Sequence, residues 1–191
     1  MEDLINKIKS QIELSSKAEQ YLLSIATEKS IQKGTTLIRE GQAVNKVFLV
    51  KSGCLRSYCT DKEGKEHTLL FAIKDWWISD YIAIHDNAYA TLTVESLIDS
   101  TVIEFNSKKI DGIHSLFPEF ESFQRHNLER HVVSLQKRIL NQLQLSALER
   151  YELFLKQYPD IEKHTRNYHI ASFLGITQQS LSRLRVEIAK K

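Results

Sequence analysis

The stretch "NYHIASFLGITQQSLSRLR", from Asn167 to Arg185, places a glycine between two groups of apolar residues at helical spacing. These apolar residues are Ile170, Ala171 and Leu174 before the glycine, and Leu181 and Leu184 after it, continued by Ile188 just beyond the stretch. Gly175 permits a tight turn that a Cβ would obstruct, and Thr177 is a suitable N-cap for the second helix. Because both apolar faces and the turn are in register, the stretch predicts a helix-turn-helix.

The second of these helices, from Thr177 to Ala189, carries short polar and cationic side chains on its first turns. We expect DNA contacts from Thr177, Gln178, Gln179, Ser180, Ser182, Arg183 and Arg185. Glutamine pairs with adenine and arginine with guanine in the major groove, while serines, Arg185 and a capped helix N-terminus suit phosphate oxygens. A helical hairpin that packs for stability alone, the alternative interpretation, has no need of such a face. The pattern therefore favours a helix that recognises base pairs of double-stranded DNA.

The whole chain has a formal charge of only +2, but basic residues gather at its carboxyl end. Between Thr165 and Lys191 there are five basic residues against one acidic residue, Glu187. The basic residues are Arg166, Arg183, Arg185, Lys190 and Lys191. A local excess of positive charge is what an anionic partner requires, although a solvated surface has the same composition.

A long helix is predicted after Pro118, where apolar residues recur three or four apart over about 25 residues. They form one narrow stripe: Leu128, Val132, Leu135, Ile139 and Leu143. A stripe this narrow suits pairing with a second helix, and packing on the chain's own domain is the alternative. Ser146 to Glu149 is a capping box that begins a further helix, which Pro159 ends. A domain boundary is therefore expected at this junction.

The segment from Ile31 to about Phe105 has short β-branched and aromatic runs that are separated by turn residues. The candidate strands are "TTLIRE", "KVFLVKSG", "CLRSYCT", "HTLLFAI", "ATLTVESL" and "STVIEF". The loop "DKEGKE" before His67 indicates a hairpin, and short strands at this spacing indicate an antiparallel sandwich or barrel. Residues 1–27 are predicted to be helical, with a capping box from Ser16 to Glu19.

These elements define an α+β chain, and their order resembles the Crp/Fnr family of bacterial transcription regulators. The resemblance is carried by "IASFLGITQQSLSRLR" and by "KVFLVKSGCLRSYCTDKEGKEHTLLFAIKDWWISDY". It implies three parts: an antiparallel jelly-roll β-barrel of the cyclic nucleotide-binding type with flanking helices (1–117), a long dimerisation helix (118–145) and a helix-turn-helix DNA-binding domain (146–191).

The same resemblance implies the partners. It predicts a homodimer on a two-fold symmetric DNA site with half-sites about one helical turn apart, and RNA polymerase as a further partner. Carried over by position, Gln178, Gln179 and Arg183 would read bases, with Ser180 and Ser182 nearer the DNA backbone.

An effector pocket is also implied, and its candidate residues are Trp76, Trp77, Ser79, Asp80 and Thr91. Asp80 corresponds to the acid that binds the ribose in members that bind a cyclic nucleotide. Their phosphate-binding arginine has no counterpart, because no arginine occurs from Lys74 through Ser107 and Ala90 stands near its position. A buried phosphate without a cation has a large desolvation penalty, unless Arg56 or a lysine enters from another strand. We therefore expect no ordinary cyclic-nucleotide binding. The two tryptophans would either line a pocket for an unidentified aromatic or apolar effector or pack in the core.

Other kinds of sensing and catalysis find less support. An iron–sulfur cluster needs four ligands, and the chain has two cysteines, Cys54 and Cys59, whose odd spacing on a strand also argues against a disulfide between them. Haem sensing needs an axial ligand, for which His67, His85 and the two cysteines are available. A cupin-like metal enzyme needs clustered histidines, and His67 stands alone among the strands. We predict no metal site and no enzyme; a small-molecule or haem sensor, or an interaction module, of the same barrel type is the alternative.

The composition, 42% hydrophobic and 26% charged, is that of an ordinary globular protein. No apolar run approaches the roughly 18 residues that span a bilayer. The start, "MEDLINKIKSQIEL", mixes charges among its apolar residues, unlike a secretory signal. We therefore expect a cytoplasmic protein without membrane contact.

Overall fold

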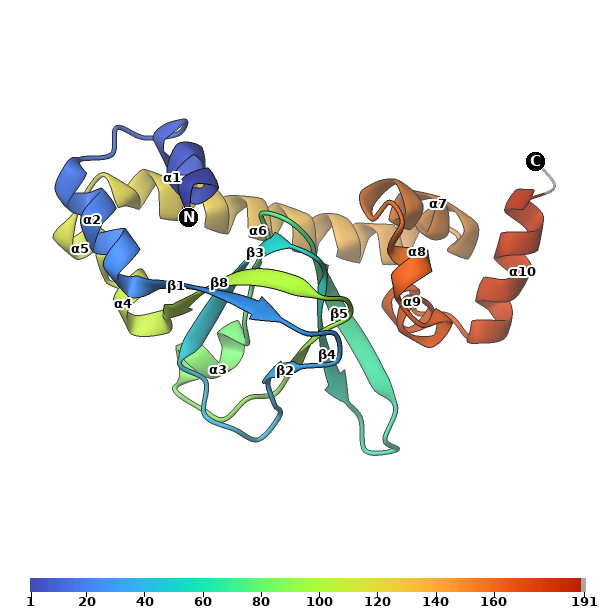
Figure 1. The fold of residues 1–191 in the computed structure, drawn as a ribbon. Helices are drawn as coiled ribbons and strands as arrows, with labels where there is room; N and C mark the ends of the chain where they lie inside the picture. The colour runs from blue at the N-terminus through green and yellow to red at the C-terminus, as the bar shows by residue number, and fades with distance from the viewer. Residues whose placement is uncertain (190–191) are drawn as a thin grey trace.

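The computed structural model describes residues 1–189, so Lys190 and Lys191 and the charge expected from them lie outside the described residues. Figure 1 shows helices at the amino end, β-strands in the middle, and a long helix, α6 (Phe120–Gln144), that runs alongside the amino-terminal helices and the strands. The carboxyl-terminal helices follow at the far end of α6. One helix therefore connects the sheets to the carboxyl-terminal domain.

The amino-terminal helices are α1 (Glu2–Lys9) and α2 (Ser16–Ile25), and their apolar residues pack against the first turn of α6. The predicted capping box at Ser16 is wrong by one residue, because Ser15 is the N-cap and its Oγ accepts a hydrogen bond from the Ala18 N–H at 3.2 Å. The chain then passes directly into strand β1 (Ala26–Ile31). The sequence gives little sign of this strand, because Ile31 is its only fully buried residue.

Two four-stranded antiparallel sheets form the middle of the chain, with the orders β1–β8–β3–β6 and β2–β7–β4–β5. Their other strands are β2 (Thr36–Ile38), β3 (Lys46–Ser52), β4 (Leu55–Thr60), β5 (Glu66–Ala72), β6 (Trp77–Ile78), β7 (Thr93–Ser96) and β8 (Ser100–Asn106). All six predicted strands are present: four are shorter than predicted, β5 begins and ends one residue earlier, and β8 is one residue longer. Strands β1 and β6 are additions.

The two sheets form the expected antiparallel jelly-roll, and the barrel is not closed. No strand pairing among residues 1–189 joins the edge of one sheet to the edge of the other. Apolar side chains from both sheets instead fill the space between them, including Phe48, Val50, Leu55 and Val94. The sandwich is therefore held by side-chain packing rather than by continuous hydrogen bonding.

Short helices connect the sheets to α6: α3 (Tyr81–Asp86), α4 (Ser107–Asp111) and α5 (Ile113–Leu116). Helix α6 has the predicted length, and α7 (Ala147–Gln157) begins with the predicted capping box. In that box, Ser146 Oγ accepts from the Glu149 N–H at 3.3 Å, and the Glu149 carboxylate accepts from the Ser146 N–H at 2.8 Å. Helix α7 ends two residues before Pro159, as predicted.

The turn from β3 to β4 provides a test of the packing between the strands, because Gly53 has a φ of +90° and an added Cβ would lie 2.2 Å from the Ser100 Oγ. We expect Gly53→Ala to lower the free energy of unfolding by at least ~3 kcal/mol, from overpacking and the left-handed backbone together. The control is Gly41→Ala, where φ is +81° but no atom lies within 4 Å of an added Cβ; it should cost roughly 1–2 kcal/mol. Denaturant unfolding measures both, and equal losses would contradict the predicted clash.

Candidate nucleic-acid interface

The carboxyl-terminal domain ends in α8 (Ile161–His164), α9 (Asn167–Leu174) and α10 (Gln178–Ala189), of which the last two form the predicted helix-turn-helix. Gly175 has the left-handed backbone that the turn requires, with a φ of 69°. Its N–H donates to the Ser172 carbonyl at 3.1 Å, and the Ile176 N–H donates to the Ala171 carbonyl at 3.0 Å, which closes α9. Ala171 and Leu181 are buried in the cluster that the two helices share.

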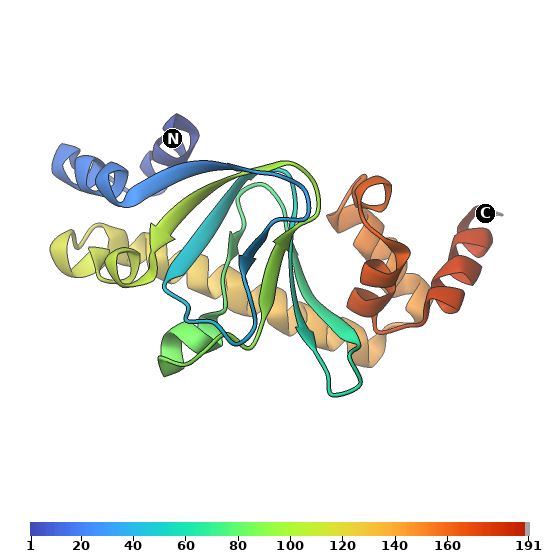
Figure 2. The ribbon, with the colours of Figure 1, turned by 60° about the horizontal axis from the view of Figure 1, so that its bottom comes forward.

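Helix α10 presents the predicted polar face to solvent. Thr177 caps it as predicted, since the Ser180 N–H donates to Thr177 Oγ1 at 3.1 Å. The residues expected to contact DNA that are exposed are Thr177, Gln178, Gln179, Ser182 and Arg183, with Ser180 half-buried. Ser182 Oγ donates to the Gln178 carbonyl at 3.1 Å. In both ribbon views α10 lies at the end of the molecule away from the sheets (Figures 1 and 2). The roles of these residues on DNA stay predictions.

Arg185 differs from the other residues expected to contact DNA. Its guanidinium pairs with the Glu162 carboxylate at 2.7 Å, and donates to Asn167 Oδ1 at 2.8 Å and to the Tyr151 hydroxyl at 3.2 Å. These contacts hold α10 against α7, α8 and α9. The structure thus gives Arg185 a role inside the domain, and the expected phosphate contact stays a prediction. The sequence could not indicate this, because two of these partners lie 23 and 34 residues away.

The apolar stripe of α6 is solvent-exposed along its length. The exposed fractions are 64% for Leu128, 44% for Val132, 39% for Leu135, 60% for Ile139 and 77% for Leu143. The side of α6 nearest the sheets uses other residues, including His131, Ser134 and Arg138, which are half-buried. The stripe therefore does not pack on the chain's own domain, and a row of exposed aliphatic side chains is unusual on a monomer.

Asp80, the candidate ribose-binding residue, is fully buried and has its hydrogen-bond partners within the protein. Its Oδ1 accepts from the Ala83 N–H at 3.0 Å, which caps α3. Its Oδ2 accepts from the Thr91 N–H at 2.6 Å, the Thr91 hydroxyl at 3.0 Å and the Leu92 N–H at 2.8 Å. Ser79 is also buried and donates to the Lys46 carbonyl at 2.7 Å. In this structure Asp80 and Thr91 hold α3 to the loop before β7, and Ser79 bonds to β3. The assignment of Ser79, Asp80 and Thr91 to an effector pocket stays a prediction.

The two tryptophans belong to different apolar clusters. Trp76 packs on the residues between the sheets and its ring lies 6.4 Å from that of Tyr158, whereas the Trp77 ring lies 5.4 Å from that of Phe105, in the cluster with α1 and α2. Both also border an open groove beside α6 that includes Tyr81 and His131. Core packing, one of the two roles considered for the tryptophans, accounts for most of their surface.

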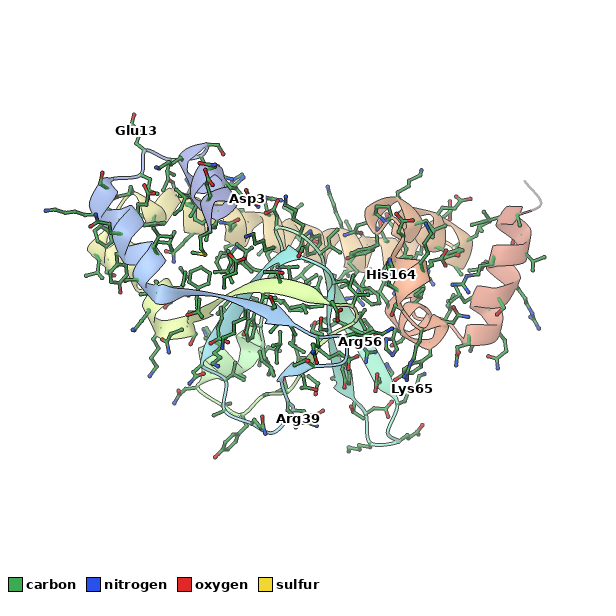
Figure 3. All side chains as sticks on the ribbon, in the orientation of Figure 1. Asp3, Glu13, Arg39, Arg56, Lys65 and His164 are labelled. Carbon is green, nitrogen blue, oxygen red and sulfur yellow. The ribbon has the colours of Figure 1, made fainter. Side chains whose placement is uncertain are left out.

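Arg56 does not enter the space between the sheets. Leu55 points into that space, and successive strand residues face opposite sides, so Arg56 lies on the outer face of β4. There it is 1% exposed and paired with Glu66 and Glu95. Figure 3 shows Arg56 on the side of the sheets nearest the carboxyl-terminal helices. With Arg56 outside and Asp80 fully bonded, the residues present do not fit a cyclic nucleotide in the family's usual pose.

The candidate metal ligands are dispersed. Both cysteines are free, and burial raises the pKa of Cys54 to about 12. His67 lies 2.6 Å from an Asp61 oxygen and His85 lies 2.9 Å from an Asp86 oxygen. Within residues 1–189, no three His, Cys, Asp or Glu side chains lie close enough together to hold a metal ion. Over the same range, no helix has the length and apolar character needed to cross a bilayer.

The residues that sequence reasoning missed lie where α9 meets the outer face of β5. They are Tyr168, His169 and Ser172. Ser172 Oγ accepts from the Thr68 N–H and donates to the Glu66 carbonyl, both at 2.8 Å. These partners are more than 100 residues apart in the chain, so no local pattern indicates the contact.

Comparison with known proteins agrees with this architecture. Residues 28–115 match the family model of the cyclic nucleotide-binding domain. The transcriptional activator protein FnrA of Stutzerimonas stutzeri is 26% identical over 65% of this chain and 50% of its own length. Electron transport regulator A of Shewanella oneidensis is 23% identical over 84% of this chain and 68% of its own length. This chain thus spans about half to two thirds of the curated relatives.

Solved structures share the fold. FixK2 from Bradyrhizobium japonicum has a TM-score of 0.73 at 18% identity, covering 87% of this chain and 85% of that chain. A putative Crp/Fnr-family regulator from Eubacterium rectale has a TM-score of 0.71 at 20% identity, covering 90% and 82%. The chain carries a cyclic nucleotide-binding domain. More particularly, it is homologous to regulators of the Fnr/Crp family, which are transcription regulators rather than enzymes.

A substitution at Asp80 tests whether its carboxylate has a structural role or is free to bind a ligand. In Asp80→Asn, one oxygen becomes an amide nitrogen that cannot accept the backbone hydrogen bonds now made. We expect the free energy of unfolding to fall by roughly 2–4 kcal/mol, because buried donors lose a charged acceptor. Thermal unfolding measures the loss, with Asp86→Asn, an exposed aspartate of α3, as the control. Unchanged stability would mean that the carboxylate is free for a ligand.

Proposed function

We propose that this protein is a sequence-specific, double-stranded DNA-binding transcription regulator. The observation that carries the proposal is the exposure of Gln178, Gln179 and Arg183 on one face of α10, while Leu181 on the other face is fully buried. A helix that offers amides and a guanidinium in this way suits the edges of adenine and guanine in the major groove. The position of α10 at one end of the molecule leaves room for a duplex (Figure 2).

The regulator would act as a homodimer. The exposed stripe from Leu128 to Leu143 gives α6 a self-complementary apolar face, and pairing two copies along it is an isologous contact. We propose a parallel pair, in which each copy carries its helix-turn-helix at the same end of the paired helices. Two reading helices related by a two-fold axis would favour a palindromic site with half-sites about one helical turn apart.

The sensor part would respond to something other than an ordinary cyclic nucleotide, if it binds an effector. Asp80 and Arg56, the groups that would meet a ribose and a phosphate, are both engaged within the protein. RNA polymerase is a further proposed partner, as expected of a transcription regulator, and a DNA-binding role would place the protein in the cytoplasm.

Selection of random DNA duplexes by the purified protein tests the function directly. We expect a recovered palindrome, which would support both sequence reading and the dimer. Recovery of no preferred sequence at any salt concentration would contradict the proposal. Calorimetry with cyclic AMP and cyclic GMP is the companion measurement, and micromolar binding of either would overturn the view of the pocket.

Arg183 tests base reading. At the selected site, Arg183→Ala should weaken binding by roughly 1–3 kcal/mol and relax the preference at one base pair of each half-site. The control is Arg39→Ala, which removes the same charge from an exposed loop below the sheets (Figure 3). Titration of labelled duplexes measures both. If Arg183→Ala weakens specific and random duplexes equally, the guanidinium contacts phosphate instead of a base.

Ile139 tests the dimer. Replacing this stripe residue with arginine would place a charge in an apolar seam, and we expect the dimer dissociation constant to rise at least about 100-fold. Leu140→Arg is the matched control, because Leu140 is 48% exposed on the same helix but lies outside the stripe. Sedimentation equilibrium distinguishes monomer from dimer in each variant. A dimer that survives Ile139→Arg and is lost in Leu140→Arg would place the interface on the other face.

A further inference from the structure

The helix-turn-helix shares its hydrophobic core with the outer face of the β2–β7–β4–β5 sheet. Phe71 of β5 is fully buried, and its ring centroid lies 5.1 Å from that of Phe173, 5.8 Å from that of Tyr158 and 5.9 Å from that of Phe154. Cys54 and Leu97 join the same cluster from the ends of the sheet. The carboxyl-terminal domain therefore completes its core with residues of the sensor domain.

Beside this apolar contact, on the same face of the sheet, lies a charged cluster in which Arg56 is buried and its two carboxylate partners are partly buried. The Arg56 guanidinium, 1% exposed, pairs with Glu66 Oε2 and with Glu95 Oε1, each at 2.6 Å, and donates to Thr68 Oγ1 at 3.3 Å. Its other side covers the Tyr58 ring at 3.9 Å. One guanidinium thus faces two carboxylates, so the sheet alone leaves one negative charge without a cation.

Helix α9 supplies hydrogen bonds to this cluster. The Tyr168 hydroxyl donates to the Glu66 carboxylate. Ser172 Oγ accepts from the Thr68 N–H and donates to the Glu66 carbonyl. The ladder between β4 and β5 shifts register beside Thr68, and the Thr68 N–H donates to Ser172 Oγ. The backbone of β5 and the side chains of α9 therefore satisfy each other's polar groups across the domain boundary.

Helix α6 also contacts β5 and α9 where these two elements meet. The Arg138 guanidinium donates to the carbonyls of Leu69 and Thr68 and lies 4.5 Å from the centre of the Phe173 ring. Its pKa is lowered by burial. His169 of α9 is 7% exposed, and burial together with the nearby Arg56 lowers its pKa to about 4. His169 therefore stays neutral near pH 7 and adds no second positive charge beside Arg56.

We propose that Arg56, Glu66 and Glu95 of the sheet, with Tyr168 and Ser172 of α9, form an interdomain latch that fixes the orientation of the helix-turn-helix for DNA binding. This inference rests on the proposed function. Swinging the domain away would uncover Phe71, leave the Thr68 N–H without its Ser172 partner and remove the Tyr168 donor from Glu66. All three changes oppose the movement.

With this latch, the orientation of α10 depends on the contact between α9 and the outer face of the sheet, and not on a ligand bound between the two sheets. In the observed orientation α10 lies at the end of the molecule and its polar face is exposed, so the latched state is the one that presents DNA-reading residues. The space between the sheets is filled by apolar side chains and Asp80 is fully bonded. Loosening the latch should therefore disfavour specific binding while leaving each domain folded.

Two conservative variants test the latch. Tyr168→Phe keeps the ring and removes the hydroxyl, and Glu66→Gln keeps the shape and removes the charge. Each should raise the dissociation constant for the selected site about tenfold, the factor expected for one charge-assisted hydrogen bond, with little change on random duplexes. The matched control is Glu104→Gln, a carboxylate of the other sheet that is likewise partly buried and pairs with Lys29 and Lys46. It should bind as the natural protein does.

A distance measurement separates a loosened latch from a general loss of structure. Spin labels at Lys62→Cys in the β4–β5 hairpin and at Glu187→Cys in α10 join exposed positions on the two sides of the latch. The background is Cys59→Ser; Cys54 is buried with a raised pKa and stays unreactive. Labelled chains are exchanged with excess unlabelled protein, so that only distances within one chain are read. We expect one narrow distribution in the natural background and a broader one in Tyr168→Phe and Glu66→Gln.

The outcomes distinguish the latch from the proposed function. Natural affinity together with an unchanged distance distribution in both latch variants would overturn the latch, even if the protein reads a palindrome. Equal broadening in Glu104→Gln would also overturn it, because the effect would then belong to any buried carboxylate. If the natural protein selects no sequence, the proposed function fails, whereas the distance distributions still report whether these residues hold the two domains together.

Discussion

The insertion of Phe71 into the aromatic cluster of Phe154, Tyr158 and Phe173 is the contact on which the arrangement of this chain depends. A helical domain as small as residues 146–189 buries little apolar surface by itself. Sharing Phe71 with the sheet enlarges that core, and it also fixes where the domain sits. Stability and orientation therefore come from the same side chain, so a change that weakens one also affects the other.

The polar contacts around Phe71 define the orientation of the helix-turn-helix on the sheet more specifically than apolar packing alone would. Hydrophobic burial has little directional preference, whereas Ser172 meets the Thr68 N–H and the Glu66 carbonyl in one geometry. The buried Arg56 group strengthens this selectivity, because charged groups removed from water are costly unless their partners are in place. The result is a domain contact in which burial supplies most of the free energy and hydrogen bonds select the pose.

Much of the architecture could be predicted because its signals are local. The capping box at Ser146, the left-handed Gly175 and the stripe of α6 each depend on residues within a few turns of one helix. Strands β1 and β6 could not be predicted, because β1 has a single buried residue and β6 is only two residues long. The partners of Asp80 and Arg185 within the protein could not be predicted, because a charged residue in a sequence indicates chemistry but not its partner. Apart from the local cap of α3, the partners of Asp80 lie 11 and 12 residues away and the Tyr151 partner of Arg185 lies 34 residues away, so the tertiary fold sets them.

Helix α6 contacts the sheet and the helix-turn-helix and also carries the exposed stripe, so one helix connects all three. One side carries Arg138, which binds the β5 carbonyls and covers Phe173, and another side carries the exposed stripe. Gln142, one turn further on, donates to the Leu174 carbonyl at the end of α9. A partner helix docked on the stripe would thus lie within a helix diameter of the residues that hold the sheet and the helix-turn-helix. A shift of α6 would move Arg138 and Gln142 directly, and through them the helix-turn-helix. For that reason we expect the dimer contacts and the orientation of the helix-turn-helix to depend on each other.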